Sequence, residues 1–170
     1  MSESEQPILE VRELRQFFPI QEGLLRRIVG YVKAVNGVSF TINQGEALGL
    51  VGESGCGKST LGRAILRLYE STEGKVIFHH QDRQLSVLDL DRPGMRQVRA
   101  NMQMIFQDPF ASLNERMTVL DNVIEPLVCN GIGSRQEQEA TAERLLVQVG
   151  LRQEHLRRYP HSFSGGQRQR

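Results

Sequence analysis

Residues 52–60 read GESGCGKST and follow directly on an apolar run, ALGLV. A helix that begins near Gly57 leaves its first backbone amides unpaired, and its dipole places partial positive charge at that end. Glycines let the backbone wrap closely around phosphate oxygens, and Lys58 adds a full positive charge. The residue types and their order therefore predict a cradle for the phosphates of a nucleotide.

The spacing fits G-x-x-x-x-G-K-[ST], a pattern in which each residue has a physical role. Lys58 is expected to reach the β- and γ-phosphates, Ser59 to ligate Mg²⁺, and Thr60 to lie near the α-phosphate. The predicted nucleotide-binding residues of this loop are Gly52, Glu53, Ser54, Gly55, Cys56, Gly57, Lys58, Ser59 and Thr60. The alternative is a glycine turn that only caps a structural helix. The sequence holds no N-K-x-D segment, so ATP is favoured over GTP.

The composition fits a folded protein rather than a nucleic-acid coat or a membrane-spanning chain. The 170 residues are 39% hydrophobic and carry a net charge of +1, which argues against a nucleic-acid partner. Cys56 and Cys129 form no CxxC pair, so a reduced, cytoplasmic setting is expected. No secretory signal and no apolar run of about 18 residues is present, so any membrane association is expected to need a partner.

The segments around the loop predict an α/β arrangement. Periodicity predicts strands at 7–14, 32–42, 45–52, 74–80 and 102–106, and a helix at 58–69. The stretch 32–42 is either one strand with a turn at Asn36-Gly37 or two short strands, and 21–31 is predicted to be an insertion loop with a basic tip. From residue 108 the pattern is helical, with helices at 118–131 and 134–151. Ser134 and Glu137 predict a capping box, and Gly150 a helix stop.

A second group of hydroxyl and glycine residues precedes a short helical pattern near Arg170. Ser164 is a good N-cap, and the amides of Gly165 and Gly166 behind it could meet an anion. A surface turn before a helix is the alternative. Together with the phosphate loop and the segment MQMIFQDP, this group, FSGGQ, resembles the signature motif of the ATP-binding subunits of ABC transporters. Phe163 stands where leucine is commoner in that family.

Longer segments resemble one branch of that family, the dipeptide/oligopeptide (and nickel) importers. They are VGESGCGKST, MQMIFQDPFASLNERM and RRYPHSFSGGQRQR; Glu115 departs from the branch, where proline is common. The resemblance implies a P-loop NTPase (RecA-like) core with an N-terminal antiparallel β subdomain and an inserted α-helical subdomain, incomplete in this chain. The implied divisions are 1–107 for the β subdomain and first part of the core, 108–163 for the helical subdomain, and 164–170 for the signature motif.

The resemblance also implies partners and further site residues. A head-to-tail dimer of ATPase subunits would place Ser164, Gly165, Gly166 and Gln167 on the ATP of the partner. Gln107 would be the Q-loop glutamine, with a catalytic role, and would share Mg²⁺ with Ser59. Phe18 is predicted to stack on adenine, with Phe17 and Tyr31 as rivals. Permease subunits and, indirectly, a solute-binding protein are the implied partners, at the inner face of the cell membrane.

In this family, an Asp-Glu pair holds Mg²⁺ and positions the attacking water. The pair follows the signature motif in the sequence, and a switch histidine follows later still. The sequence to Arg170 contains neither, so the chain as given is expected to be inactive alone, as the N-terminal portion of an importer ATPase. The alternative is a catalytically dead nucleotide-binding fragment with no transport role. An ABC-type ATPase that acts on nucleic acid is disfavoured by the near-neutral charge.

Overall fold

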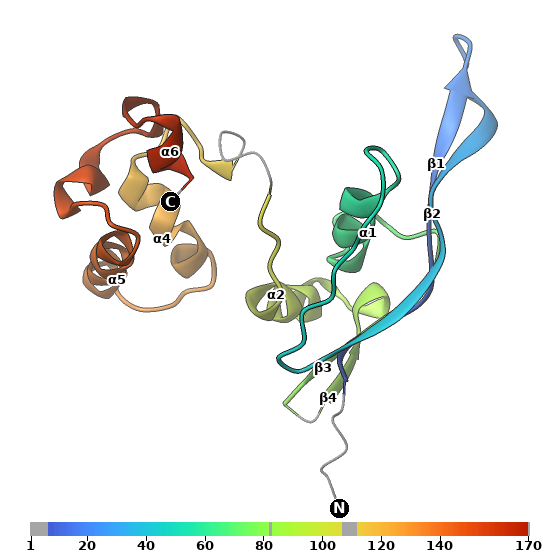
Figure 1. Cartoon of the computed structure of the whole chain (residues 1–170), viewed down its shortest axis with the longest axis horizontal. Coiled ribbons are helices and arrows are strands. Elements are labelled where there is room, and N and C mark those ends of the chain that lie inside the picture. Colours follow the sequence, from blue (N-terminus) through green and yellow to red (C-terminus); the bar gives the residue numbers. More distant parts are fainter. Residues whose placement is uncertain (1–6, 82, 107–111, 170) are drawn as a thin grey trace, which may run out of the picture. The chain divides into compact units, whose positions relative to one another are not determined.

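The computed structural model describes residues 7–81, 83–106 and 112–169 (Figure 1). The chain divides into two compact units, residues 1–104 and residues 105–170. The first unit contains every described strand and the phosphate loop, and the second is helical. The predicted subdomain divisions at 107, 163 and 170 stay predictions.

The first unit is built on an antiparallel sheet with the strand order β2-β1-β3-β4. Its strands are β1 (Pro7–Glu22), β2 (Arg27–Asn43), β3 (Glu73–His80) and β4 (Arg83–Ser86). Its helices are α1 (Lys58–Ile65), the 3₁₀ turn η1 (Val87–Asp89) and α2 (Arg92–Asn101). The predicted N-terminal antiparallel β subdomain is thus confirmed.

One hydrophobic core joins the sheet to its helices. Alternate residues of β1 and β3 point to the same face, as the period of two requires. The buried members are Leu9, Val11, Leu14, Val35, Leu61, Ala64, Val76, Phe78, Val87, Met95 and Val98. Leu61 and Ala64 come from α1, so the buried face of this helix fixes the position of the phosphate loop at its N-terminus. The helix is shorter than predicted because Arg67 has a φ of 49°, outside the helical region.

Two predictions about the first hairpin were wrong. Residues 21–31 do not form an insertion loop, because the two strands continue through them and pair as far as Glu22 with Arg27. Asn36-Gly37 does not turn the chain. Gly37, with a φ of 72°, is the extra residue of a bulge in β2, since Leu14 pairs with Val38 and Arg15 with Asn36.

The strands predicted at 45–52 and 102–106 are not present as strands. Leu48 and Leu50 are about half exposed, and Ile105 is 95% exposed. A strand is stable only when its backbone groups pair with a neighbour, and neither segment pairs with another strand among the described residues. Both strand predictions were therefore wrong, because apolar composition alone does not specify a pairing partner.

The second unit contains α4 (Val119–Cys129), α5 (Arg135–Gln148), two 3₁₀ turns, η2 (Gln153–Arg157) and η3 (Pro160–Ser162), and α6 (Gly165–Arg168). Both long helices were predicted. Ile124 of α4 and Ala142 and Leu146 of α5 form one hydrophobic cluster with Leu156 of η2. Among the helices of the described ranges, none combines the length and apolar character needed to cross a membrane.

The predicted capping box at the start of α5 is present. The Ser134 side chain accepts from the Glu137 amide, and the Glu137 carboxylate accepts from the Ser134 amide at 2.7 Å. That backbone hydrogen bond, with a second one from the Ser134 hydroxyl, holds the pKa of Glu137 below its usual value. Gly150, with a φ of 75°, ends the helix as expected.

Replacing Gly74 with alanine tests the close contact of β3 with β1. A Cβ at Gly74 would lie 2.6 Å from both the Glu13 carbonyl oxygen and the Leu14 Cα. Gly45 has a similar positive φ, but its Cβ would meet no described atom within 4 Å. We expect Gly74→Ala to lower the free energy of unfolding by more than about 2 kcal/mol and Gly45→Ala by about 1 kcal/mol, measured by urea unfolding. Equal losses would contradict the assigned contact.

Candidate functional site

The phosphate loop runs from Gly52 to the first turn of α1. The Cys56 amide donates to the Glu53 carbonyl at 3.3 Å, which closes a turn within the loop. Gly57, with a φ of 100°, is the N-cap of α1, and its carbonyl accepts from the Leu61 amide at 2.8 Å. Glycine is required here because other residues rarely adopt this backbone conformation. The structure therefore contains the predicted loop, followed by a glycine N-cap and a helix.

The loop is held against β2 by a backbone-to-backbone approach at Gly57. A Cβ built on Gly57 would lie 2.1 Å from the carbonyl oxygen of Ala34, a distance that no side chain can occupy. A Cβ on Gly52 would lie 2.6 Å from the Cys56 sulfur, so this glycine also allows the loop to close on itself. Ala34 was not predicted from the sequence, because its contribution comes from its backbone rather than from its side-chain type.

Lys58 lies across the loop and supplies its positive charge. Its Nζ donates to the carbonyl oxygens of Gly52 at 2.7 Å and Glu53 at 2.6 Å, and it lies 3.6 Å from the Cys56 sulfur. The first turn of α1, which the structure describes in full, contains no acidic side chain. The ammonium group and the helix dipole therefore act together at one point, where they favour an anion.

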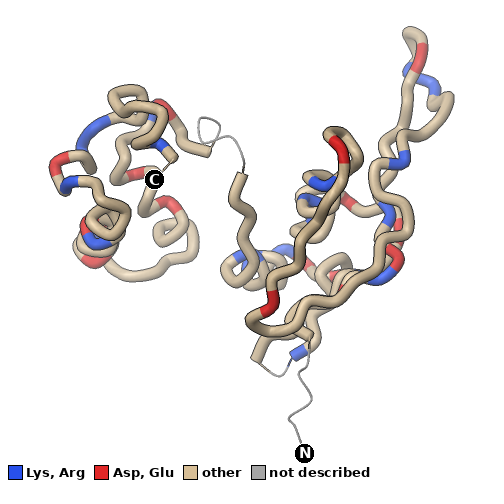
Figure 2. The backbone as a smooth tube through the Cα atoms, viewed as in Figure 1, with Lys and Arg blue, Asp and Glu red and all other residues tan. Residues whose placement is uncertain are grey.

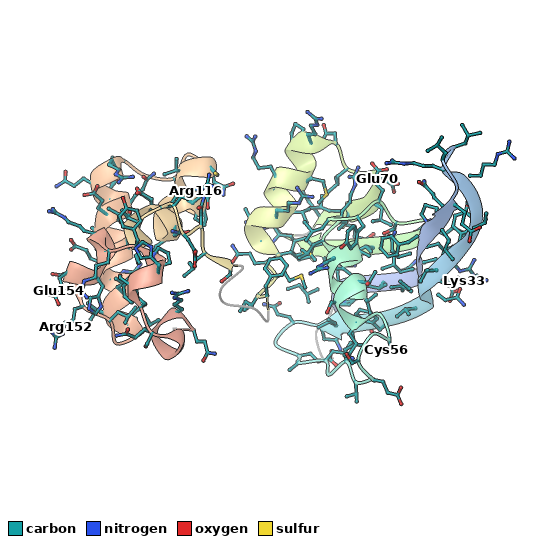
Figure 3. All side chains as sticks on the ribbon, turned by 90° about the horizontal axis from the view of Figure 1, so that it is seen from above. Lys33, Cys56, Glu70, Arg116, Arg152 and Glu154 are labelled. Atoms are coloured by element: carbon teal, nitrogen blue, oxygen red, sulfur yellow. The ribbon has the colours of Figure 1, made fainter. Side chains whose placement is uncertain are left out.

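A pocket of about 330 Å³ adjoins the loop. One wall comes from β2 and the other from the loop and α1; Figure 3 labels a side chain from each, Lys33 and Cys56. The lining residues are Lys33, Ala34, Val35, Asn36, Val38, Leu50, Val51, Cys56, Gly57, Lys58 and Leu61. The loop residues Glu53, Ser54, Gly55 and Ser59 are exposed, so a ligand can reach them. The site is an open cavity with a cationic end, suited to a ligand that carries phosphates.

The aromatic residues named as adenine candidates differ in their surroundings. The Phe18 ring meets Tyr69, which follows α1, edge to face with the ring centroids 5.4 Å apart. The Phe17 ring lies 5.7 Å from Nζ of Lys33, which lines the pocket. Tyr31 is 57% exposed. The assignment of Phe18 stays a prediction.

The second predicted motif forms an N-cap on a single short turn of helix. The Ser164 hydroxyl accepts from the Gln167 amide at 3.3 Å, and the Gln167 side chain accepts from the Ser164 amide at 3.1 Å. Gly165 and Gly166 are exposed in the first turn of α6. Gln107 lies outside the described residues. The roles predicted for these residues stay predictions.

The chain belongs to the ABC transporter family. The family model described as "ABC transporter" matches residues 35–170, which include the phosphate loop and the Ser164 motif. The resemblance stated from the sequence motifs is therefore confirmed. The fold agrees, because the dimeric post-hydrolysis structure of the ATP-binding cassette MJ0796 with ADP and Pi superposes with a TM-score of 0.74 at 27% identity. That match covers 95% of this chain and 65% of the cassette.

Curated relatives extend the comparison to whole transport proteins. The chain is 50% identical over 168 residues to the oligopeptide transport ATP-binding protein AppF of Bacillus subtilis, covering 98% of this chain and 50% of AppF. It is 51% identical over 166 residues to the glutathione import ATP-binding protein GsiA of Escherichia coli K12, covering 97% of this chain and 26% of GsiA. The chain therefore spans half the length of AppF and about a quarter of GsiA.

Alanine at Gly57 and at Gly55 should have unequal effects on nucleotide binding. Both glycines have positive φ, but a Cβ at Gly55 meets no described atom within 4 Å, whereas one at Gly57 meets the Ala34 carbonyl. We expect Gly57→Ala to raise the Kd of a fluorescent ATP analogue at least about ten-fold more than Gly55→Ala, a difference of about 1.4 kcal/mol. Equal Kd values would show that the contact with β2 does not shape the loop.

Proposed function

We propose that this chain is the ATP-binding part of an importer that couples ATP hydrolysis to the uptake of peptides or similar small solutes. The observation that carries the proposal is the position of Lys58, at the N-terminus of α1 and between loop carbonyls that a phosphate can replace. Relatives at 50% and 51% identity are an oligopeptide transport protein and a glutathione import protein, which supports this class of solute.

Mg²⁺ fits the donor set that the sequence assigns to it. The Ser59 hydroxyl is exposed in the first turn of α1, one residue from the lysine, where a cation between the phosphates and the helix can take an oxygen ligand. Gln107 is proposed as a second oxygen donor. Bound Mg²⁺ would neutralise charge on the β- and γ-phosphates, while Lys58 and the loop amides orient them.

A second ATPase subunit is proposed to complete the site. The hydroxyl and amides at Ser164, Gly165 and Gly166 are exposed and lie together at the start of α6, so they can face a phosphate held by another subunit. The match to a cassette solved as a dimer supports this arrangement. Permease subunits, and through them a solute-binding protein, would place the chain at the cytoplasmic face of the membrane.

Adenine is proposed to stack on an aromatic ring of the first hairpin, with Phe18 as the assigned residue. Every base presents a flat face, and aromatic rings favour such contacts. Phe17 remains the rival that the contacts favour, since its ring lies by Lys33 at the edge of the pocket.

Removal of the Lys58 ammonium should weaken ATP binding specifically. One charge-assisted contact to a phosphate contributes roughly 2–3 kcal/mol, so Lys58→Ala should raise the Kd for ATP about 30- to 150-fold. Lys75→Ala is the matched control, because Lys75 is an exposed lysine on β3 away from the pocket lining. Isothermal titration in the presence of Mg²⁺ measures both. A Kd that Lys58→Ala leaves unchanged would overturn the proposed site.

Loss of the Ser164 hydroxyl should weaken ATP-dependent dimer formation without changing the affinity for ATP. If Ser164 faces the ATP of a partner, Ser164→Ala should keep the Kd for ATP but weaken ATP-dependent association at least about ten-fold. Ser162→Ala is the control, since Ser162 is an exposed serine whose hydroxyl donates to the Tyr159 carbonyl. Sedimentation velocity on the whole protein, with and without ATP, measures association. Equal association by Ser164→Ala and the wild type would contradict a role at the dimer interface.

A further inference from the structure

The end of the first hairpin, residues 20–32, contributes no residue to the lining of the pocket beside the phosphate loop. We call this segment the hairpin tip. In the described sheet, β3 pairs with β1 only from Leu9 to Arg15, so the tip strands pair only with each other. Figure 1 shows the β1-β2 hairpin extending well beyond the part of the sheet formed with β3 and β4.

Two leucines stand at the apex of the tip. The Arg26 amide donates to the Gly23 carbonyl at 3.1 Å, which closes a turn with Leu24 and Leu25 at its centre. Leu24 is 102% exposed and Leu25 is 77% exposed. Turns at hairpin ends usually have polar or glycine residues at these positions, so two leucines this exposed have no explanation in the packing of the fold.

Apolar side chains also cover both faces of the ribbon below the apex. Tyr31 and Val32 are adjacent in a regularly paired part of β2, so they point to opposite faces, and they are 57% and 53% exposed. Ile28 and Val29, nearer the apex, are 54% and 56% exposed. Ile20 on β1 is exposed as well. A flat protein partner would need only one apolar face. An occupant of this tip must surround it on both faces.

The apolar tip carries an excess of positive charge. Arg26 and Arg27 follow the leucines directly, against the single carboxylate of Glu22. In Figure 2, both blue (basic) and red (acidic) positions lie at the far end of the β1-β2 hairpin. Long arginine side chains can hold their aliphatic stems along apolar surface while the guanidinium groups reach phosphate oxygens. The chemistry that matches both features is an anionic lipid surface.

We propose that the hairpin tip inserts into the interface of a bilayer that contains anionic phospholipid. Leu24 and Leu25 would enter the boundary between headgroups and acyl chains, with Ile28 and Val29 around them. Arg26 and Arg27 would bind lipid phosphates. This contact goes beyond the proposed function, because it attaches the chain directly to lipid without the permease and does not involve the nucleotide.

The test is co-sedimentation of the full chain with protein-free vesicles. Vesicles of phosphatidylcholine mixed with phosphatidylglycerol are compared with vesicles of phosphatidylcholine alone. The double variant Leu24→Ser/Leu25→Ser should lower the partition coefficient on mixed vesicles about ten-fold. The double variant Arg26→Gln/Arg27→Gln should also lower it about ten-fold, and should abolish the preference for the anionic lipid.

Matched controls come from the second unit. Ile132 and Val147 are 54% and 57% exposed, so Ile132→Ser/Val147→Ser removes aliphatic surface of similar exposure elsewhere. Arg144→Gln/Arg157→Gln removes two exposed arginines in the same way. Both controls should keep the wild-type partition coefficient. Circular dichroism and the Kd for ATP, measured on every variant, separate a lost lipid contact from misfolding and from failure of the nucleotide site.

A fluorescence reporter locates the insertion independently. The sequence contains no tryptophan, so Leu25→Trp places a single tryptophan at the apex, and Val147→Trp places one on α5 as the control. Mixed vesicles should shift the emission of Leu25→Trp to shorter wavelength, and brominated lipid should quench it. The emission of Val147→Trp should not change.

Three results would overturn the proposal. The first is wild-type binding that the leucine and arginine variants leave unchanged. The second is an apex tryptophan that stays in water when the protein is bound to vesicles. The third is no binding of the wild-type chain to protein-free vesicles of either composition, which would favour a protein partner for the tip instead.

Discussion

The approach of the Gly57 backbone to the Ala34 carbonyl is the constraint on which the site depends. It fixes the N-terminus of α1 against β2 at a separation that admits hydrogen but no carbon side chain. The buried residues Leu61 and Ala64 hold the rest of the helix on the same sheet. The start of the helix and the wall on β2 therefore line the same pocket.

The antiparallel sheet and the helix supply different parts of this site. The sheet provides one wall of the pocket through β2, which pairs along its length with β1. The helix provides the dipole and the lysine. The second unit, taken by itself, has a hydrogen-bonded turn at Ser164 that begins the short helix α6. A helix start is thus the structural feature that the two predicted anion sites share.

The sequence predicted those parts of the structure that are stabilised by interactions between residues close together in the chain. The loop, the Ser134 capping box and the helices follow from hydrogen bonds within a few residues, and each was found. The strand predicted at 45–52 failed because strand formation depends on a partner, which no local pattern specifies. The hairpin at 21–31 was missed because its exposed leucines do not alternate with polar residues. The Ala34 carbonyl was missed because any residue type has one.

The two hydrogen bonds from Lys58 to the loop carbonyls have a consequence for ligand selection. The ammonium has three N–H donors, of which two are used by the Gly52 and Glu53 carbonyls, so a ligand must take the third donor or compete with a carbonyl for one of the others. A neutral acceptor that competes in this way would replace one carbonyl with another of equal strength and bring no net enthalpy. Only an oxygen with a full negative charge outcompetes both carbonyls. At this ammonium, a charged phosphate oxygen is therefore a stronger competitor than the neutral oxygens of a nucleoside.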